Sequence, residues 1–348
     1  LVVGGGTSGV TAATAAATHG ARTALLEMNA GLGGTGTYGG VHSYWFGRRV
    51  GFAARVTESA NQLHSDLNHR PAQGSIPKWN IEIKAESLRS TVDQTDVVLL
   101  TNATVFAILT EGDRVCGVLA ATRLGPVAVL AHVVVDASGD GDIAAFAGAE
   151  TVYGSERDHV TMWYSLAQFS QPGLTRNNFT STVDVSNVVD YTRAILAGRR
   201  RFGRANPHEH GTYVAPRESR HIRGDVVLTL TDQLLHRAWP DVVNIAFSNS
   251  DMKGHTTSDW FRTGLISPNL EIEIPYRALL PQGIENLIVV GKALSATHDA
   301  LPAIRMQPDL ENLGGAAGIA AAMVCKSKST LRSIDLHLLQ EALVREQV

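Results

Sequence analysis

The chain has 348 residues, of which 44% are hydrophobic and 18% are charged, with a formal net charge of −3. This length suits about two domains, each with its own core. The charge balance offers no surface for nucleic acid or an anionic membrane, and the longest run of small apolar residues, Gly314 to Cys325, is too short to span a bilayer. The two cysteines, Cys116 and Cys325, form no CxxC pair and are expected to be buried, inert thiols.

The first part of the chain has a βαβ pattern. A short apolar strand ending at Val3 leads into a glycine-rich turn, an alanine-rich helix from Val10 to about Thr18, and a strand from Thr23 to Leu26. Because a strand usually has about five or six residues, we expect further residues before Leu1, and a targeting segment could lie among them. The protein itself is expected to be cytoplasmic.

A glycine-rich stretch from Gly31 to Gly40 comes next, followed by two predicted helices, Ala53 to Leu67 and Ala85 to Asp93. Glu111-Gly112-Asp113 has the composition of a hairpin turn between two strands. The strands predicted in this part are Val97–Leu100, Thr104–Leu109, Arg114–Thr122 and Val127–Asp136.

From about Thr151 aromatic and polar residues increase. This part predicts a helix from Val185 to Arg200 and the strands Thr161–Phe169, Val226–Leu230 and Val242–Phe247. The βαβ character returns near the end, with a strand at Leu287–Gly291, an alanine-rich helix at Gly315–Val324 and a tail helix from Thr330 to Arg345.

The order of these elements predicts an α/β fold. We expect a discontinuous Rossmann-like dinucleotide-binding domain, with a parallel sheet, helices on one face and a β-meander, and an inserted α+β substrate domain. The expected parts are 1–150 (with 41–90 as a cap or substrate-side excursion), 151–274 for the substrate domain, 275–325 for the end of the dinucleotide domain, and 326–348 for a C-terminal helix.

The motif with the most weight is Gly4-Gly5-Gly6-Thr7-Ser8-Gly9, which fits GxGxxG between a strand and a helix. Gly4 allows the tight turn, Gly6 lets the backbone approach a pyrophosphate, and Gly9 lets the helix pack closely on the strand. Glu27 closes the next strand, where a carboxylate accepts hydrogen bonds from ribose and repels a 2′-phosphate. The pattern therefore predicts a dinucleotide site and disfavours NADP.

A second glycine-rich turn, Leu32-Gly33-Gly34-Thr35-Gly36-Thr37, favours the extended FAD over NAD. With this turn, the sequence resembles the large FAD-dependent oxidoreductase family that has a flavin domain of the two-dinucleotide-binding type. The resemblance is carried by four blocks: LVVGGGTSGVTAATAAATHGARTALLE with GLGGTG, VVVDASGDGDIAAFAGAE, APRESRHIRGD, and IPYRALLPQGIENLIVVGKALSATHDALPAIRMQPDLENLGGAAGIAAAM.

The resemblance implies FAD as the cofactor and gives roles to particular residues. The fingerprint residues and Glu27 would hold the ADP half, and a helix N-terminus at Gly314, Gly315 and Ala316 would lie beside the flavin pyrimidine ring, where it stabilises negative charge. The remaining contacts that it implies are Gly33, Gly34, Thr35, Val105, Ser138, Gly139 and Gly291.

A histidine suits the proton transfer that accompanies hydride transfer to a flavin, because its ordinary pKa of about 6.5 lies near working pH. His298, in Ser295-Ala296-Thr297-His298-Asp299, lies between Gly291 and the predicted helix, and we expect it or Asp299 to handle the proton. His42 is a second candidate, for contact with the flavin or substrate and, with a lower expectation, for covalent attachment of FAD.

Arg217 and Arg305 are candidates for fixing a substrate carboxylate or hydroxyl by bidentate hydrogen bonds. An internal ion pair between Arg217 and Glu218 is the competing interpretation. We therefore expect a small, hydroxylated or carboxylated substrate. No metal site is expected, because His208-Glu209-His210 lacks the spacing of a helical zinc motif and is expected to be a solvated loop.

The sequence predicts an FAD-dependent oxidoreductase, either an oxidase or a dehydrogenase, that transfers a hydride between a small polar substrate and flavin N5. Two alternatives stay open at this point: an NAD-dependent dehydrogenase, and an FAD-binding protein without catalytic activity.

Overall fold

The computed structural model describes residues 1–67, 78–171, 174–178, 181–201 and 213–348. Its centre is a five-stranded parallel sheet in the order β15-β7-β1-β2-β3. β1, β7 and β15 are short and fully buried, as is usual for strands of a sheet covered on both faces. The strand bounds are β1 Val2–Val3, β2 Ala24–Leu26, β3 Val98–Leu100, β7 Val134–Asp136 and β15 Leu287–Val289.

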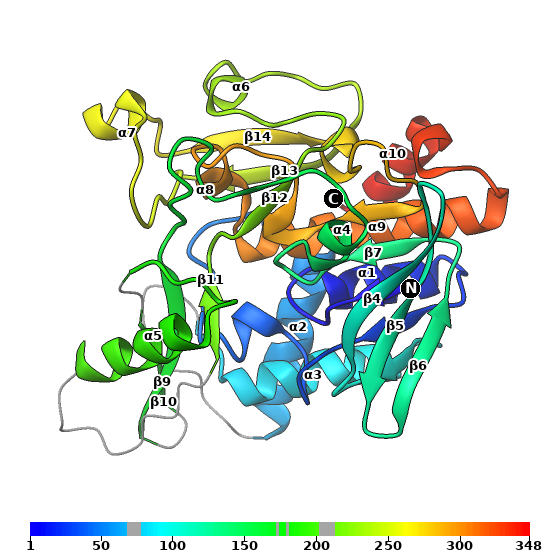
Figure 1. Cartoon of the computed structure of the whole chain (residues 1–348), viewed down its shortest axis with the longest axis horizontal. Coiled ribbons are helices and arrows are strands. Elements are labelled where there is room, and N and C mark those ends of the chain that lie inside the picture. The colour runs from blue at the N-terminus through cyan, green and yellow to red at the C-terminus, as the bar shows by residue number, and fades with distance from the viewer. Residues whose placement is uncertain (68–77, 172–173, 179–180, 202–212) are drawn as a thin grey trace.

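Two alanine-rich helices from opposite ends of the chain, α1 (Gly9–Thr18) and α9 (Gln307–Ser327), pack against each other beside this sheet (Figure 1). A methyl group on Gly318 would lie 2.2 Å from the carbonyl oxygen of Ala12, so the two backbones approach closely. α2 (Gly51–Asp66) and α3 (Ile81–Asp93) pack on each other, and α2 also contacts α9. Asn80 caps α3 by accepting hydrogen bonds from the N–H groups of Glu82 and Ile83.

A three-stranded antiparallel meander follows β3, with Gly112 at a positive φ in the turn between its first two strands. Its strands are β4 Thr104–Glu111, β5 Arg114–Thr122 and β6 Gly125–Leu130. The expected α/β fold with a parallel sheet and a meander is confirmed, and β15 beside β7 makes the sheet discontinuous in sequence.

Strands β9, β10 and β11 form a small antiparallel sheet that extends away from the parallel sheet together with α5 (Figure 1, lower left). β13 and β14 form an antiparallel pair that lies against α9 and α8. The remaining strands are β8 Thr151–Tyr153, β9 Tyr164–Gln171, β10 Leu174–Asn178, β11 Val214–Pro216, β12 Arg220–Ile222, β13 Val242–Ser248 and β14 Leu270–Pro275.

The other helices are α4 Asp142–Phe146, α5 Val188–Arg201, α6 Leu230–Leu234, α7 Asp259–Thr263, α8 Leu301–Ile304 and α10 Leu336–Arg345, with 3₁₀ turns η1 Gly34–Gly36, η2 Tyr276–Leu279, η3 Gly291–Ala293 and η4 Leu331–Ser333. Within the described part of the chain, no helix combines the length and the apolar character needed to cross a bilayer.

Several predicted elements were wrong in extent. The single strand predicted at Val127–Asp136 is divided between β6 and β7, which belong to different sheets. Val226–Leu230 forms only an isolated bridge at Leu228, because Thr229 and Asp232 make a capping box that starts α6 at Leu230.

The predicted tail helix is a 3₁₀ turn, η4, followed by α10. The expectation of two buried thiols was also wrong, since Cys325 is exposed near the end of α9 and Cys116 is only half-buried on the meander.

Candidate functional site

A cavity of about 380 Å³ opens where the parallel strands β1, β2, β7 and β15 end. This volume falls within the range of roughly 300–1,000 Å³ that ligand pockets have. Ligands of open α/β sheets bind at this edge, outside the carboxyl ends of the strands. The cavity is lined by the residues that directly follow each strand, including Gly4, Glu27, Ser138 and Gly291.

The three fingerprint glycines have different surroundings. Gly4 has a φ of +98°, and a methyl group there would lie 2.4 Å from the carbonyl oxygen of Ala137. A methyl group on Gly9 would lie 1.7 Å from the carbonyl oxygen of Gly4, whereas one on Gly6 would meet no atom within 4 Å. The turn and packing roles predicted for Gly4 and Gly9 are therefore confirmed. Gly6, Thr7 and Ser8 line the cavity, and their contact with a phosphate stays a prediction.

Glu27 is 5% exposed and lines the cavity. Its carboxylate accepts hydrogen bonds from the N–H of Gly5 at 2.6 Å and from the backbone and side-chain N–H groups of Asn29 at 2.7 Å. Burial raises the pKa of Glu27, and these hydrogen bonds act against that rise. The geometry holds the carboxylate at the position where the sequence predicts a ribose contact.

The second glycine-rich turn lies beside the fingerprint. The N–H of Gly33 donates to the carbonyl oxygen of Gly5 at 2.8 Å, and Gly34 and Thr35 line the cavity. Val105 lines it from the meander. His42 is not among the described lining residues, and its Nδ1 lies 2.9 Å from the carbonyl oxygen of Gly40. Its predicted contact or covalent link with the flavin stays untested.

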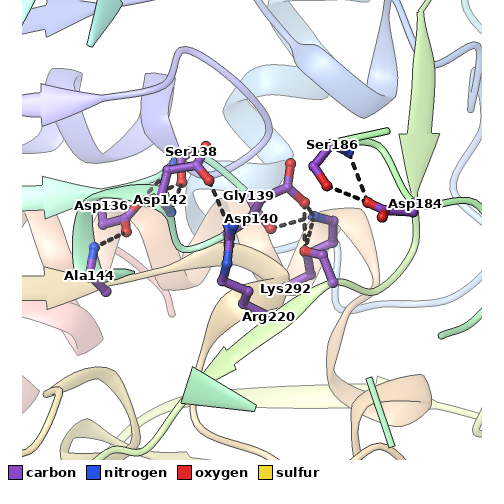
Figure 2. A network of polar contacts seen from close by, with 11 residues as sticks. Asp136, Ser138, Gly139, Asp140, Asp142, Ala144, Asp184, Ser186, Arg220 and Lys292 are labelled. Carbon is purple, nitrogen blue, oxygen red and sulfur yellow. Dashed lines mark hydrogen bonds and ion pairs between the residues drawn. The ribbon is translucent and has the colours of Figure 1, made fainter. Parts of the chain in front are cut away.

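Charged residues form a network along the wall made by β7 and η3 (Figure 2). The ammonium group of Lys292 contacts the carbonyl oxygen of Gly139 and lies 2.5 Å from Oδ1 of Asp140. Asp136 accepts hydrogen bonds from both the N–H and the hydroxyl of Ser138. These contacts fix the backbone of Ser138 and Gly139 at the cavity.

The N-terminus of α9 reaches the cavity at Gln307 rather than at Gly314. The side-chain N–H of Gln307 donates to the carbonyl oxygen of Val41 at 2.8 Å, while its Oε1 is buried and has no hydrogen-bond partner among the described residues. A helix N-terminus there supplies free N–H groups and a partial positive charge.

The helix start predicted at Gly314, Gly315 and Ala316 was wrong, because these residues lie inside α9 and are not among the residues that line the cavity. A methyl group on Gly314 would lie 2.1 Å from the carbonyl oxygen of Ser8, and one on Gly315 would lie 2.2 Å from the ring of Phe52. The two glycines therefore serve close packing of α9 on α1 and α2.

Arg217 and Arg305 both line the cavity, as their predicted substrate role requires. Arg305 donates from Nη2 to the carbonyl oxygen of Asp251 at 2.5 Å, and its buried Nε has no partner among the described residues. Arg217 donates to the carbonyl oxygen of Trp163 at 2.9 Å. Burial, followed by repulsion from Arg305, lowers the pKa of Arg217 to about 9, so Arg217 carries a charge at neutral pH. Burial also lowers the pKa of Arg305, and the charges of Asp251 and Glu218 act against that change.

The ion pair considered between Arg217 and Glu218 is not what the structure contains. Glu218 is fully buried and instead accepts hydrogen bonds from His221 at 2.8 Å and from Nδ1 of His298 at 2.8 and 2.9 Å. His298 is buried and is not among the described residues that line the cavity. Asp299 accepts a hydrogen bond from the hydroxyl of Thr256 at 2.7 Å.

The proton-transfer role of His298 and Asp299 stays a prediction, and the geometry does not favour it for His298. Nε2 of this ring lies 2.7 Å from the carbonyl oxygen of His255. Both ring nitrogens therefore face acceptors, and a ring that donates from both has no lone pair for a substrate proton.

Among the described residues no group of histidine, cysteine and acidic side chains is arranged to hold a metal ion. His208-Glu209-His210 lies outside the described residues.

Sequence reasoning missed Lys292, Gln307 and Tyr213 as lining residues. For Gln307 a signal was present, since Pro308 and Asp309 mark a helix start. Nothing in the pattern around Tyr213 could have revealed it.

A parallel sheet with this fingerprint, a carboxylate after the second strand and a cavity across the strand ends define a dinucleotide-binding protein. The model of the FAD dependent oxidoreductase family matches residues 1–210 and 180–343, so the chain belongs to this family. Its cofactor is FAD. Gly6, which leaves open space, and Gln307, whose buried Oε1 has no hydrogen-bond partner among the described residues, both line the cavity, and this lining fits a flavin nucleotide.

Solved structures support the fold. The anhydrotetracycline hydroxylase OxyS from Streptomyces rimosus is 14% identical with a TM-score of 0.51, over 99% of this chain and 65% of that one. CabE, an aromatic hydroxylase from angucycline biosynthesis, is 16% identical with a TM-score of 0.50, over 94% of this chain and 62% of that one. The chain thus spans less than two thirds of the length of either protein. No curated protein sequence matches the chain.

Proposed function

We propose that the protein transfers a hydride between FAD and a small organic substrate that carries a carboxylate or hydroxyl group. The observation that carries this proposal is the pair of half-buried arginines, Arg217 and Arg305, which line the same cavity as the dinucleotide fingerprint. Bound FAD supplies the acceptor or donor of the electron pair.

Arg305 has the better-defined role. Its guanidinium is oriented by Asp251, and its Nε has no partner among the described residues, although it is buried. A buried donor without an acceptor costs roughly 1–3 kcal/mol, and a substrate oxygen would remove that cost. A planar guanidinium also fixes a carboxylate in one orientation, which hydride transfer requires.

The test is anaerobic mixing of the FAD-loaded protein with hydroxy acids, amino acids and sugars, followed through the visible absorbance of the flavin. Bleaching by one of these classes supports the proposal. Because OxyS and CabE are described as hydroxylases, NAD(P)H is tested in parallel. Bleaching by NAD(P)H alone, accelerated by an aromatic compound, would point to hydroxylation. If no donor bleaches the flavin, a non-catalytic FAD protein becomes the better explanation.

Replacing Arg305 with Gln should weaken binding of a carboxylate substrate by about 10²-fold or more, since a charge-assisted hydrogen bond contributes about 1.5–3 kcal/mol and the partner charge is left unpaired. FAD content should not change. Arg305→Lys keeps the charge but removes the planar fork, and should recover only part of the affinity. Equal affinities in all three proteins would contradict the assignment.

A further inference from the structure

Glu218 lies at the centre of a buried polar cluster and directly follows Arg217, one of the two arginines that line the cavity. Its side chain is 0% exposed, and its carboxylate accepts hydrogen bonds from the N–H of Met162 at 2.8 Å, from Nε2 of His221 at 2.8 Å and from Nδ1 of His298 at 2.8 Å. A carboxylate that is buried this deeply requires a positive partner, because an isolated charge in the interior is strongly destabilised.

His298 is that partner. Glu218 lies against Nδ1, and the carbonyl oxygen of His255 lies 2.7 Å from Nε2. Both neighbours are acceptors, so the ring makes both hydrogen bonds only when both nitrogens carry protons. His221 differs, because its Nδ1 is buried without a hydrogen-bond partner among the described residues, so its hydrogen bond to Glu218 does not require protons on both ring nitrogens.

The charges around His298 come from several elements. Burial acts to lower the pKa of His298, but the hydrogen bond and charge of Glu218 outweigh it and raise the pKa to about 9, with a smaller contribution from Asp299. The charge of His298 also contributes to lowering the pKa of Asp158, and the charge of Glu218 acts to raise the pKa of Arg305. His221 shares the Glu218 carboxylate.

The second hydrogen bond of His298 reaches the segment 249–258, which follows β13 and includes His255 and Asp251. Asp251 is the residue that orients Arg305, through its carbonyl oxygen at 2.5 Å and its carboxylate at 3.5 Å. The same segment accepts a hydrogen bond from the N–H of Trp163 at the carbonyl oxygen of Lys253, at 2.7 Å.

Arg217 joins the same arrangement from the other side. It directly precedes Glu218 in the chain and donates to the carbonyl oxygen of Trp163 at 2.9 Å. The two cavity arginines are therefore connected to one buried ion pair, Arg305 through the segment 249–258 and Arg217 through the backbone next to Glu218.

We propose that Glu218 and His298 act as positioning residues, and that their ion pair holds the segment 249–258 so that Arg305 and Arg217 face the substrate. The inference rests on the proposed function, because it assigns these arginines to an anionic substrate. It predicts that anion affinity depends on the charge of His298, a residue outside the cavity.

The first experiment titrates the FAD-loaded protein with benzoate, a carboxylate probe, and follows the visible spectrum of the flavin between pH 6.5 and 10. The dissociation constant should increase by about tenfold as pH rises through 9, a change equivalent to about 1.4 kcal/mol. FAD content should stay constant across the series. A benzoate affinity that does not change over this range would overturn the proposal without the need for any variant.

The second experiment separates His298 from other groups that titrate near the same pH, such as Arg217. His298→Gln should bind benzoate about tenfold more weakly at pH 7 and lose the step near pH 9. His221→Gln is the matched control, because it also removes a partner of Glu218, while the described hydrogen bonds of His221 do not reach the segment 249–258. Glu218→Asp, which keeps the charge, should retain more affinity than Glu218→Gln.

The outcomes distinguish the two proposals. If Arg305→Gln weakens benzoate binding while His298→Gln keeps wild-type affinity and the pH step, the positioning role is wrong and the proposed anion site stands. If Arg305→Gln also binds like the wild type, the anion site itself is wrong. Equal losses in His298→Gln and His221→Gln would indicate general disruption of the cluster and contradict positioning through the segment 249–258.

Discussion

At Gly6 a methyl group would meet no other atom within 4 Å, whereas at Gly9 it would lie 1.7 Å from the carbonyl oxygen of Gly4. The GxGxxG pattern contains both residues, and the pattern alone does not show which glycine the fold requires and which one a ligand requires. The structure separates a glycine that the fold requires from a glycine whose missing side chain leaves room at the cavity.

Gly9→Ala should therefore destabilise the protein and Gly6→Ala should not. For Gly9→Ala we expect a loss of about 2 kcal/mol or more, because the added atom meets backbone that cannot move without disturbing the turn. For Gly6→Ala the unfolding curve without FAD should match the wild type, while FAD affinity falls about tenfold or more. Urea unfolding of the apoprotein and FAD titration measure the two effects, and a reversed pattern would show that the ligand approaches elsewhere.

At the level of single residues, sequence reasoning predicted part of the lining of the cavity. Glu27, Gly34, Val105 and Arg305 were predicted and do line it. Glu218 was considered only as a partner of Arg217, because adjacent charges in a sequence suggest a pair. In β11–β12 and the turn between them, the two side chains have different partners. Of the residues that contact the Glu218 carboxylate, His221 is near in sequence, whereas Met162 and His298 are 56 and 80 positions away.

Among the elements, α9 shows most clearly how a pattern can be correct in type and wrong in extent. The glycines near its middle resemble a helix start, but the helix begins at Gln307, where Pro308 and the acidic Asp309 fit the first turn. Likewise, the apolar run that was read as one strand is divided because β6 alternates between half-buried and exposed residues in the meander, while β7 is buried throughout in the parallel sheet. Apolar character alone does not show where one sheet ends.

Gly314→Ala should test the packing role of this helix. The added methyl group would lie 2.1 Å from the carbonyl oxygen of Ser8, so α1 and α9 must separate. We expect a loss of about 1–3 kcal/mol and a lower Tm in differential scanning fluorimetry. Cys325→Ala, at an exposed position of α9, is the control and should change stability by less than about 0.5 kcal/mol. An unchanged Tm for Gly314→Ala would mean that the helices are not in close contact.

In the whole molecule, strands from both ends of the sequence make one sheet, and the cavity arginines and the buried ion pair come partly from the residues between β7 and β15 and partly from the segment after β15. This discontinuity could be predicted, because the βαβ pattern stops near residue 150 and returns at Leu287. The arrangement within the middle part could not, since its contacts join residues far apart in sequence.

The ion pair should make the stability of the whole protein depend on pH. The pKa of His298 is raised to about 9 in the folded protein from an ordinary value of 6.5. The stabilisation is therefore complete below pH 6.5 and is lost as pH rises through 9, and a shift of this size corresponds to roughly 3 kcal/mol. Urea unfolding at pH 6, 7.5 and 9.5 should show this decline, and His298→Gln should flatten it. A wild-type stability that increases over this range would contradict the assignment.

The close approach of α1 and α9 also has a consequence for cotranslational folding. α1 is synthesised long before α9, and the helix that covers α1 is not complete until residue 327 has been added. Until then the alanine-rich face of α1 lacks its partner, and β15 joins the sheet only after residue 289 has been added. The cavity, to which α9 contributes Gln307 and Leu310, is therefore complete only when residues from both parts of the chain are present, and the apolar surface exposed before that point favours aggregation of the nascent chain.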